Sequence, residues 1–206
     1  MKFKKCAKTI LHICIILSSF IGILLQCGLG SSSFSFRTFR MFTTLSNLAV
    51  LIYFLFDLFI PRNNLMRKMK FTITLCIMLT GLVAAILLRG MFDSMTYMQR
   101  IGIFLLHDVT PICTVLDYFV FDEKGYTTKD MPLIAADFPL LYVTYIFITA
   151  SSYTGSDKYP YPFININQIG LPMVCINIIL LAIIFIGVGY LIIFMDHKMK
   201  EGKKYE

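Results

Sequence analysis

This chain consists of long apolar stretches separated by short polar segments. The six apolar stretches cover residues 10–29, 42–60, 71–91, 101–121, 133–151 and 170–195. A helix needs roughly 20 mostly apolar residues to cross a bilayer, whereas the strands of a membrane β-barrel alternate over about 10 residues. The pattern therefore predicts an all-α polytopic membrane protein, with six transmembrane helices in a single domain over residues 1–206.

The composition agrees with this class of protein. Hydrophobic residues make up 57% of the chain and charged residues 15%, and the mean hydropathy is +0.74. Soluble domains average about 25% charged residues. We therefore expect a multi-pass protein of the cell membrane, whose function depends on the few polar groups kept inside the apolar stretches.

Positive charge concentrates in three segments of the chain. They are the N-terminus with Lys2, Lys4, Lys5 and Lys8, the second loop with Arg62, Arg67, Lys68 and Lys70, and the C-terminus with Lys198, Lys200, Lys203 and Lys204. Because basic loops stay in the cytoplasm, this pattern predicts that both termini are cytoplasmic. The net charge of +7 then reflects topology and anionic headgroups, so we expect membrane lipids as partners and no nucleic acid.

Cysteine and histidine spacing does not suggest a metal or cofactor site. The six cysteines are scattered without a C-x-x-C pair, and the three histidines stand alone. The chain also lacks the G-x-S-x-G, P-loop and G-x-G-x-x-G motifs of common hydrolases and nucleotide enzymes. We expect no metal and no cofactor, and we interpret His12 as a core or helix-interface residue.

Two polar faces are predicted inside the membrane. In the second stretch, Thr43, Ser46 and Asn47 lie at i, i+3 and i+4 and share one helix face. In the fourth stretch, a stripe at i, i+3, i+7 and i+10 is formed by His107, Thr110, Thr114 and Asp117. Lipid cannot hydrogen-bond to these groups, so both faces should turn inward. Pro111 should free the carbonyl of His107 from its helical bond and kink the helix there.

The predicted topology sorts the polar groups into two membrane levels. The outer level would hold Thr43, Ser46, Asn47, Arg89 and His107, together with the loop that contains Tyr159 and Tyr161. The inner level would hold Asp57, Asp117 and Asp137. Ionisable groups inside spans are candidates for function by default. Simpler roles are open for several of them: Arg89 could reach the headgroups, the tyrosine loop could be an interfacial anchor, and Asp57 and Asp117 could hold helices together.

Three segments resemble motifs of a bacterial six-span family called Pr-six-Pr. Residues 42–48, FTTLSNL, resemble its F-T-x-x-S-N-L signature, and residues 107–117 resemble its H-x-x-x-P-x-x-x-x-x-D segment. Residues 159–163, YPYPF, resemble its Y-P-Y-P-F loop. The three segments occur in the family's order, so the resemblance covers nearly the whole chain and implies the six-span fold.

That family is similar in layout to the androgen-induced membrane hydrolases of animals, which cleave fatty acid esters of hydroxy fatty acids. The resemblance implies Thr43 as nucleophile and His107 as base, positions that fall on the two polar faces. The animal proteins lack the S-N pair and the Y-P-Y-P-F loop, and their proline is spaced differently after the histidine.

Two functions follow as expectations. The first is hydrolysis of a fatty acyl ester, because a neutral histidine suits the task of activating a threonine hydroxyl. Substrate contacts or oxyanion donors would then come from Ser46, Asn47 and Arg89, with Tyr159 and Tyr161 also at the substrate. The alternative is a non-catalytic lipid-binding protein or a small-molecule transporter that uses the same polar region.

Overall fold

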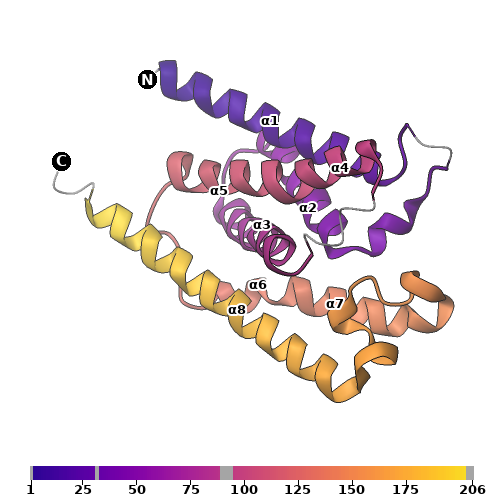
Figure 1. The fold of residues 1–206 in the computed structure, drawn as a ribbon. Coiled ribbons are helices and arrows are strands. Elements are labelled where there is room, and N and C mark those ends of the chain that lie inside the picture. The colour runs from indigo at the N-terminus through magenta and orange to yellow at the C-terminus, as the bar shows by residue number, and fades with distance from the viewer. Residues whose placement is uncertain (1, 31–32, 89–94, 203–206) are drawn as a thin grey trace. The chain divides into compact units, whose positions relative to one another are not determined.

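A computed structural model describes residues 2–30, 33–88 and 95–202 (Figure 1). Within these ranges the regular structure is helical and contains no strand. The chain divides into two compact units, Met1–Glu123 and Lys124–Glu206, which are described separately.

The first unit contains the predicted polar faces. Its elements are α1 (Lys2–Gln26), the 3-10 helix η1 (Phe36–Arg40), α2 (Phe42–Asp57), α3 (Asn64–Val83), the π-helix η2 (Ala84–Leu88), α4 (Tyr97–Phe104), the π-helix η4 (Leu105–Val109) and α5 (Thr110–Phe121). Helix α1 packs against α2, α4 and α5, and α3 packs against α2 and α5 (Figure 1). Local capping sets the start of two helices: Asn63 accepts a hydrogen bond from the Met66 amide at 2.9 Å, and Thr96 forms a capping box with Gln99.

The fourth apolar stretch is one continuous helix with a widened turn at its centre. The amide of Thr110 donates to the carbonyl of Leu105, five residues earlier, which is the hydrogen bond of a π-helix. Pro111 follows directly and has no N–H to donate to His107. The loss of the hydrogen bond to the His107 carbonyl was predicted from the sequence. The π-helical turn just before Pro111 was not. His107 lies inside this turn, and π-turns occur frequently at functional sites.

Helix α1 has the inverted polarity expected of a helix in lipid. Its large exposed apolar side chains follow a helical repeat and include Ile10, Ile13, Leu17 and Phe20. His12, Ser18 and Ser19 are buried. Ser18 bonds Thr110 of α5 at 2.8 Å between the two hydroxyl oxygens. Polar groups that meet each other inside the unit need no partner from the lipid.

Glycine allows α1 and the π-turn to pack closely. A Cβ atom at Gly22 would lie 2.6 Å from Cδ2 of Leu106, a side chain that is itself fully buried. A Cβ atom at Gly102 would meet the side chain of Gln26 at 2.8 Å. Small residues at such contacts are typical of membrane helix pairs, because they let the backbones approach.

We expect Gly22→Ala to destabilise the protein by about 1–3 kcal/mol, because the added methyl group would lie 2.6 and 2.8 Å from two carbons of the fully buried Leu106 and 3.2 Å from Cβ of Leu105. Gly187 is the matched control, since a Cβ atom there meets nothing within 4 Å. Gly187→Ala should be neutral or stabilising by up to about 1 kcal/mol through helix propensity. Thermal unfolding in detergent measures both variants. A Gly22→Ala protein as stable as wild type would contradict this packing.

The second unit contains α6 (Met131–Ala135), α7 (Asp137–Thr149), α8 (Ile166–Gly202) and three short 3-10 helices, η5 (Ala150–Ser152), η6 (Gly155–Asp157) and η7 (Pro162–Ile164). Gly170 has φ 76° and kinks the start of α8, just before Pro172. Near the other end of α8, buried Asp196 accepts bonds from the Gly125 amide at 2.7 Å and the Thr127 hydroxyl at 3.1 Å. These bonds tie the segment before α6 to α8.

The predicted helical class is confirmed, because all six apolar stretches contain helix. Five helical stretches are long and apolar enough to cross a membrane, which indicates a membrane protein. Helix α2 is shorter, at 16 residues. Several helices extend beyond the predicted apolar stretches: α1 begins at Lys2, before residue 10, α3 begins at Asn64, before residue 71, and α8 ends at Gly202, after residue 195. Lys70 is therefore a buried helical residue, not a loop residue.

Candidate functional site

The predicted face of α2 is buried and hydrogen-bonded. Thr43, Ser46 and Asn47 are at most 8% exposed. The Ser46 hydroxyl donates to the Thr43 carbonyl at 3.1 Å, and the Asn47 amide donates to the same carbonyl at 2.8 Å. Asn47 also donates to the carbonyl of Leu106 at 3.1 Å. The backbone of Thr43 is thus held from two side chains, and Asn47 connects α2 to the π-turn.

Ser46 on this face contacts Thr80 of α3, and the backbone of Thr80 contacts His107. Ser46 Oγ lies 2.8 Å from Oγ1 of Thr80, and Thr80 donates to the Cys76 carbonyl at 3.2 Å. The ring of His107 makes a hydrogen bond with the backbone of Thr80. The structure therefore brings Ser46, Thr80 and His107 together. Ser46 bonds the backbone carbonyl of Thr43, and His107 bonds the backbone of Thr80, so these contacts link the backbone of Thr43, not its hydroxyl, to the region of His107. Thr80 was not among the residues singled out from the sequence.

This geometry bears on the roles expected of Ser46 and Asn47. A neutral amide has two N–H groups, and Asn47 directs its nitrogen at two carbonyl oxygens. Ser46 likewise bonds a carbonyl and a neighbouring hydroxyl. In this conformation both side chains position the backbone of Thr43, so they would have to rearrange before donating to a substrate.

The remaining predicted contacts lie elsewhere in the chain. Arg89 falls outside the described residues. Tyr159 and Tyr161 belong to the second unit, where Tyr161 is buried. The Tyr161 ring meets the Tyr142 ring of α7 edge-on at a centroid distance of 6.5 Å and stacks on Phe163 at 5.1 Å. The YPYPF loop thus packs on α7.

The inward orientation predicted for the fourth stretch is confirmed for three of its four residues. Thr110, Thr114 and Asp117 are completely buried. His107 is partly buried. The same helix therefore connects the His107 region to a second polar region around Asp117.

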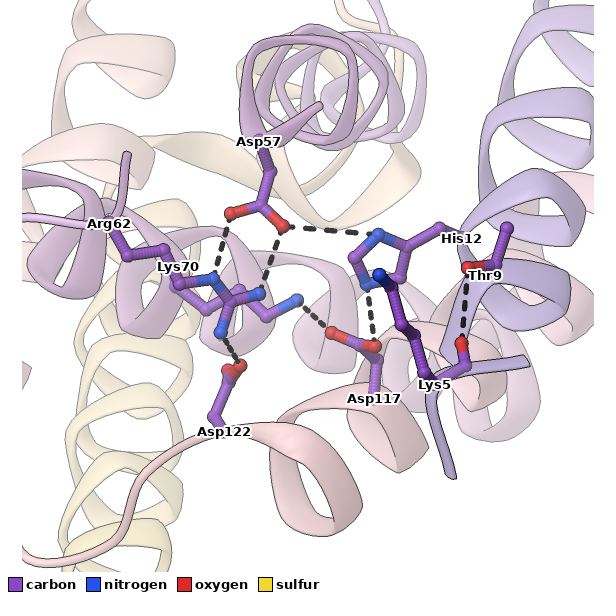
Figure 2. A network of polar contacts seen from close by, with 8 residues as sticks. All are labelled: Lys5, Thr9, His12, Asp57, Arg62, Lys70, Asp117 and Asp122. Atoms are coloured by element: carbon purple, nitrogen blue, oxygen red, sulfur yellow. Dashed lines mark hydrogen bonds and ion pairs between the residues drawn. The ribbon is translucent and has the colours of Figure 1, made fainter. Parts of the chain in front are cut away.

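Around Asp117 the first unit contains a buried ionic cluster, formed by His12, Asp57, Arg62, Lys70, Asp117 and Asp122 (Figure 2). Asp117 lies at its centre. One carboxylate oxygen lies 2.9 Å from Nε2 of His12, and the other accepts from Nζ of Lys70 at 2.5 Å. Lys70 also lies over the ring of Phe54, with Nζ 3.9 Å from the centroid. A lysine that is 1% exposed is thereby neutralised from one side and covered by an aromatic ring on another.

Arg62 forms the other half of the ionic cluster. Its guanidinium makes two bonds with Asp57, at 2.8 and 2.9 Å, and a third with Asp122 (Figure 2). Burial would lower the pKa of Arg62, but the hydrogen bonds and charges of Asp57 and Asp122 outweigh it and raise the pKa above its usual value. Nδ1 of His12 lies 3.9 Å from a carboxylate oxygen of Asp57. His12 thereby connects the contacts of Asp117 with those of Arg62.

The ionic cluster was only partly visible in the sequence. Asp57 and Asp117 were predicted to share the inner level, and the structure places both in the cluster. His12 was interpreted as a core residue and Lys70 as a loop residue. The pairing of each with Asp117 was not predicted. The available signal was the position of three ionisable residues a few residues inside the ends of apolar stretches: His12, Asp57 and Asp117.

The described residues contain no group of three or more histidine, cysteine or acidic side chains arranged to hold a metal ion. The six cysteines are free, and Cys14 and Cys113 approach to 3.9 Å between sulfur atoms. No family model, no curated protein and no solved structure matches this chain.

Proposed function

We propose that this chain is a six-span protein of the cell membrane, with both termini cytoplasmic, that hydrolyses a fatty acyl ester. Thr43 would be the nucleophile and His107 the base, and esters of hydroxy fatty acids would be the substrate class. The resemblance to the Pr-six-Pr signatures motivates this proposal, since those signatures contain both residues.

One structural observation supports the proposal: the two proposed catalytic residues lie on elements that contact each other. Thr43 and His107 lie on neighbouring elements, α2 and the π-turn, which Asn47 links directly through its bond to Leu106. A buried line of polar groups, Ser46 and Thr80, runs between them. A partly buried imidazole close to hydroxyl groups, in a widened helical turn, is a suitable environment for proton transfer from a threonine.

Ester hydrolysis would proceed in two steps, transfer of the acyl group to Thr43 and its release by water. His107 accepts the proton of the Thr43 hydroxyl as its oxygen attacks the ester carbonyl, and the proton passes to the departing alcohol while an acyl-threonine ester forms. Water then attacks that ester, with His107 as base again, to release the fatty acid and restore the hydroxyl. Ser46 and Asn47 would keep the Thr43 backbone in place during both steps. Arg89, Tyr159 and Tyr161 remain proposed substrate contacts.

A second candidate is a non-catalytic lipid-binding protein or a small-molecule transporter. The buried ionic cluster favours it, because charged groups inside apolar helices often mark substrate or ion pathways. The two candidates differ in whether the hydroxyl of Thr43 reacts.

Covalent labelling separates them. A fluorophosphonate with a long alkyl chain should label the wild-type protein in membranes, and Thr43→Val should abolish the labelling. Thr44→Val is the matched control, because Thr44 is also buried but bonds Thr38 at 2.9 Å between hydroxyl oxygens. That variant should be labelled like wild type. Absence of labelling in folded wild-type protein, or equal labelling of Thr43→Val, would favour the non-catalytic candidate.

A further inference from the structure

The charges of the buried ionic cluster do not balance unless a proton is bound. Three carboxylates, from Asp57, Asp117 and Asp122, face two permanent cations, Lys70 and Arg62. With a neutral His12 the cluster would carry one net negative charge. All of its side chains except Arg62 are at most 7% exposed, and Arg62 is 27% exposed. An uncompensated charge at such a place is costly, whereas one bound proton makes the cluster neutral.

The geometry assigns this proton to His12. Its Nε2 lies 2.9 Å from a carboxylate oxygen of Asp117, and its Nδ1 lies 3.9 Å from a carboxylate oxygen of Asp57 (Figure 2). A neutral imidazole has one N–H and one lone pair, so one nitrogen would direct its lone pair at a carboxylate. An imidazolium has an N–H on both sides and suits both carboxylates.

The neighbouring elements reinforce this assignment. Asp57 faces His12 from α2 and Asp117 faces it from α5, with Lys70 of α3 and Arg62 behind them. The ring of Phe54 meets the imidazole edge-on at 4.8 Å between centroids and covers another side. On α1 itself, the lysines nearest in sequence, Lys8 and Lys5, lie one and two turns toward the N-terminus, and Lys5 is exposed. The carboxylates are thus the charged groups in direct contact with the ring among the residues described.

We propose that the buried ionic cluster is a proton-binding site, with His12 as the group that takes up and releases one proton between Asp57 and Asp117. The site is distinct from the Thr43–His107 region and does not depend on its chemistry. His12 lies nine residues beyond Phe3, where the stretch of α1 that is long and apolar enough to cross a membrane begins, or about 14 Å along the axis. Loss of the proton leaves a negative charge between α1, α2 and α5. Proton binding is therefore coupled to how tightly α1 packs on the other two helices.

Nitrogen NMR of the full chain in lipid nanodiscs, with ¹⁵N-labelled histidine, tests this proposal. Three histidines give three sets of signals, and His12→Gln identifies those of His12. At pH 7 both ring nitrogens of His12 should carry a proton. Asp57→Asn removes one carboxylate charge and should remove the second N–H signal. His197 is the internal control, because its Nε2 contacts only a neutral carbonyl, that of Thr127, at 3.0 Å in the contacts described.

Raising the pH then distinguishes an exchangeable proton from a permanent structural charge. The second N–H signal of His12 should disappear and return reversibly. In a uniformly ¹⁵N-labelled sample, the backbone amide signals of buried residues in α3 should keep their folded positions over the same pH range. A neutral, singly protonated His12 at pH 7 in the folded wild-type protein would overturn the proposal. So would a proton found on a carboxyl group of the cluster instead, or deprotonation only together with irreversible unfolding. The wild-type measurement decides the assignment even if Asp57→Asn does not fold.

Discussion

Replacing Asp117 with asparagine should lower the free energy of unfolding by about 3–5 kcal/mol, because it leaves the ammonium of Lys70 buried without its carboxylate. Lys70 and Asp117 are 1% and 0% exposed, so water cannot replace the lost partner. Chemical or thermal unfolding in detergent measures the loss. Few single substitutions have effects of this size, and those that do usually break a buried network or create a cavity.

A surface ion pair of the same unit provides the control. Arg67 and Glu123 form an ion pair in which the side chains are 34% and 66% exposed. Glu123→Gln should therefore change stability by less than about 1 kcal/mol. Replacing both buried partners, in Lys70→Met with Asp117→Leu, should recover part of the loss, since apolar side chains can substitute for a buried pair. An Asp117→Asn protein within about 1 kcal/mol of wild type would show that the buried pair has no structural importance.

The same substitution separates stability from turnover. Asp117 is ten residues beyond His107, or roughly 15 Å along the helix, so it should not take part in ester hydrolysis. Asp117→Asn protein that folds should keep its hydrolytic activity. Complete loss of turnover in well-folded Asp117→Asn would mean that the two polar regions act together.

Thr43→Val should reduce hydrolysis of a fatty acyl ester by about 10³-fold or more, while the protein remains inserted and folded. We expect the protein to stay folded because Ser46 and Asn47 bond the backbone carbonyl of Thr43, which valine retains. Valine also keeps the β-branched shape. Release of fatty acid from a long-chain ester, measured with protein of equal purity, gives the rate.

His107→Gln should cause a similar loss, and the double variant should be hardly slower than either single variant. Residues that act as one catalytic unit are strongly non-additive, whereas independent contributions would multiply. Thr44→Val, which loses only its bond to Thr38, should be nearly neutral for turnover. Equal activity in wild type and Thr43→Val, or loss only in Thr44→Val, would leave the binding or transport function.

Helix positions and inward faces were predictable from the sequence because both follow from local rules. A long apolar run has to form helix in a bilayer, since its backbone groups find no other partners there. The spacing of Thr110, Thr114 and Asp117 puts them on one face, and the absence of water in lipid turns that face inward. The same reasoning placed Thr43, Ser46 and Asn47 on a buried face of α2.

Which faces meet was decided only by the tertiary structure. His12 and Asp117 are 105 residues apart and Lys70 and Asp117 are 47 apart, so their pairing depends on how α1, α3 and α5 pack. Sequence spacing assigned Lys70 to a loop, because a charged residue at the edge of an apolar stretch costs less in water than in lipid. The carboxylate of Asp117, on another helix, lowers the cost of burying Lys70 enough for it to lie inside the unit. A single sequence does not reveal which residue of a neighbouring helix will be the partner.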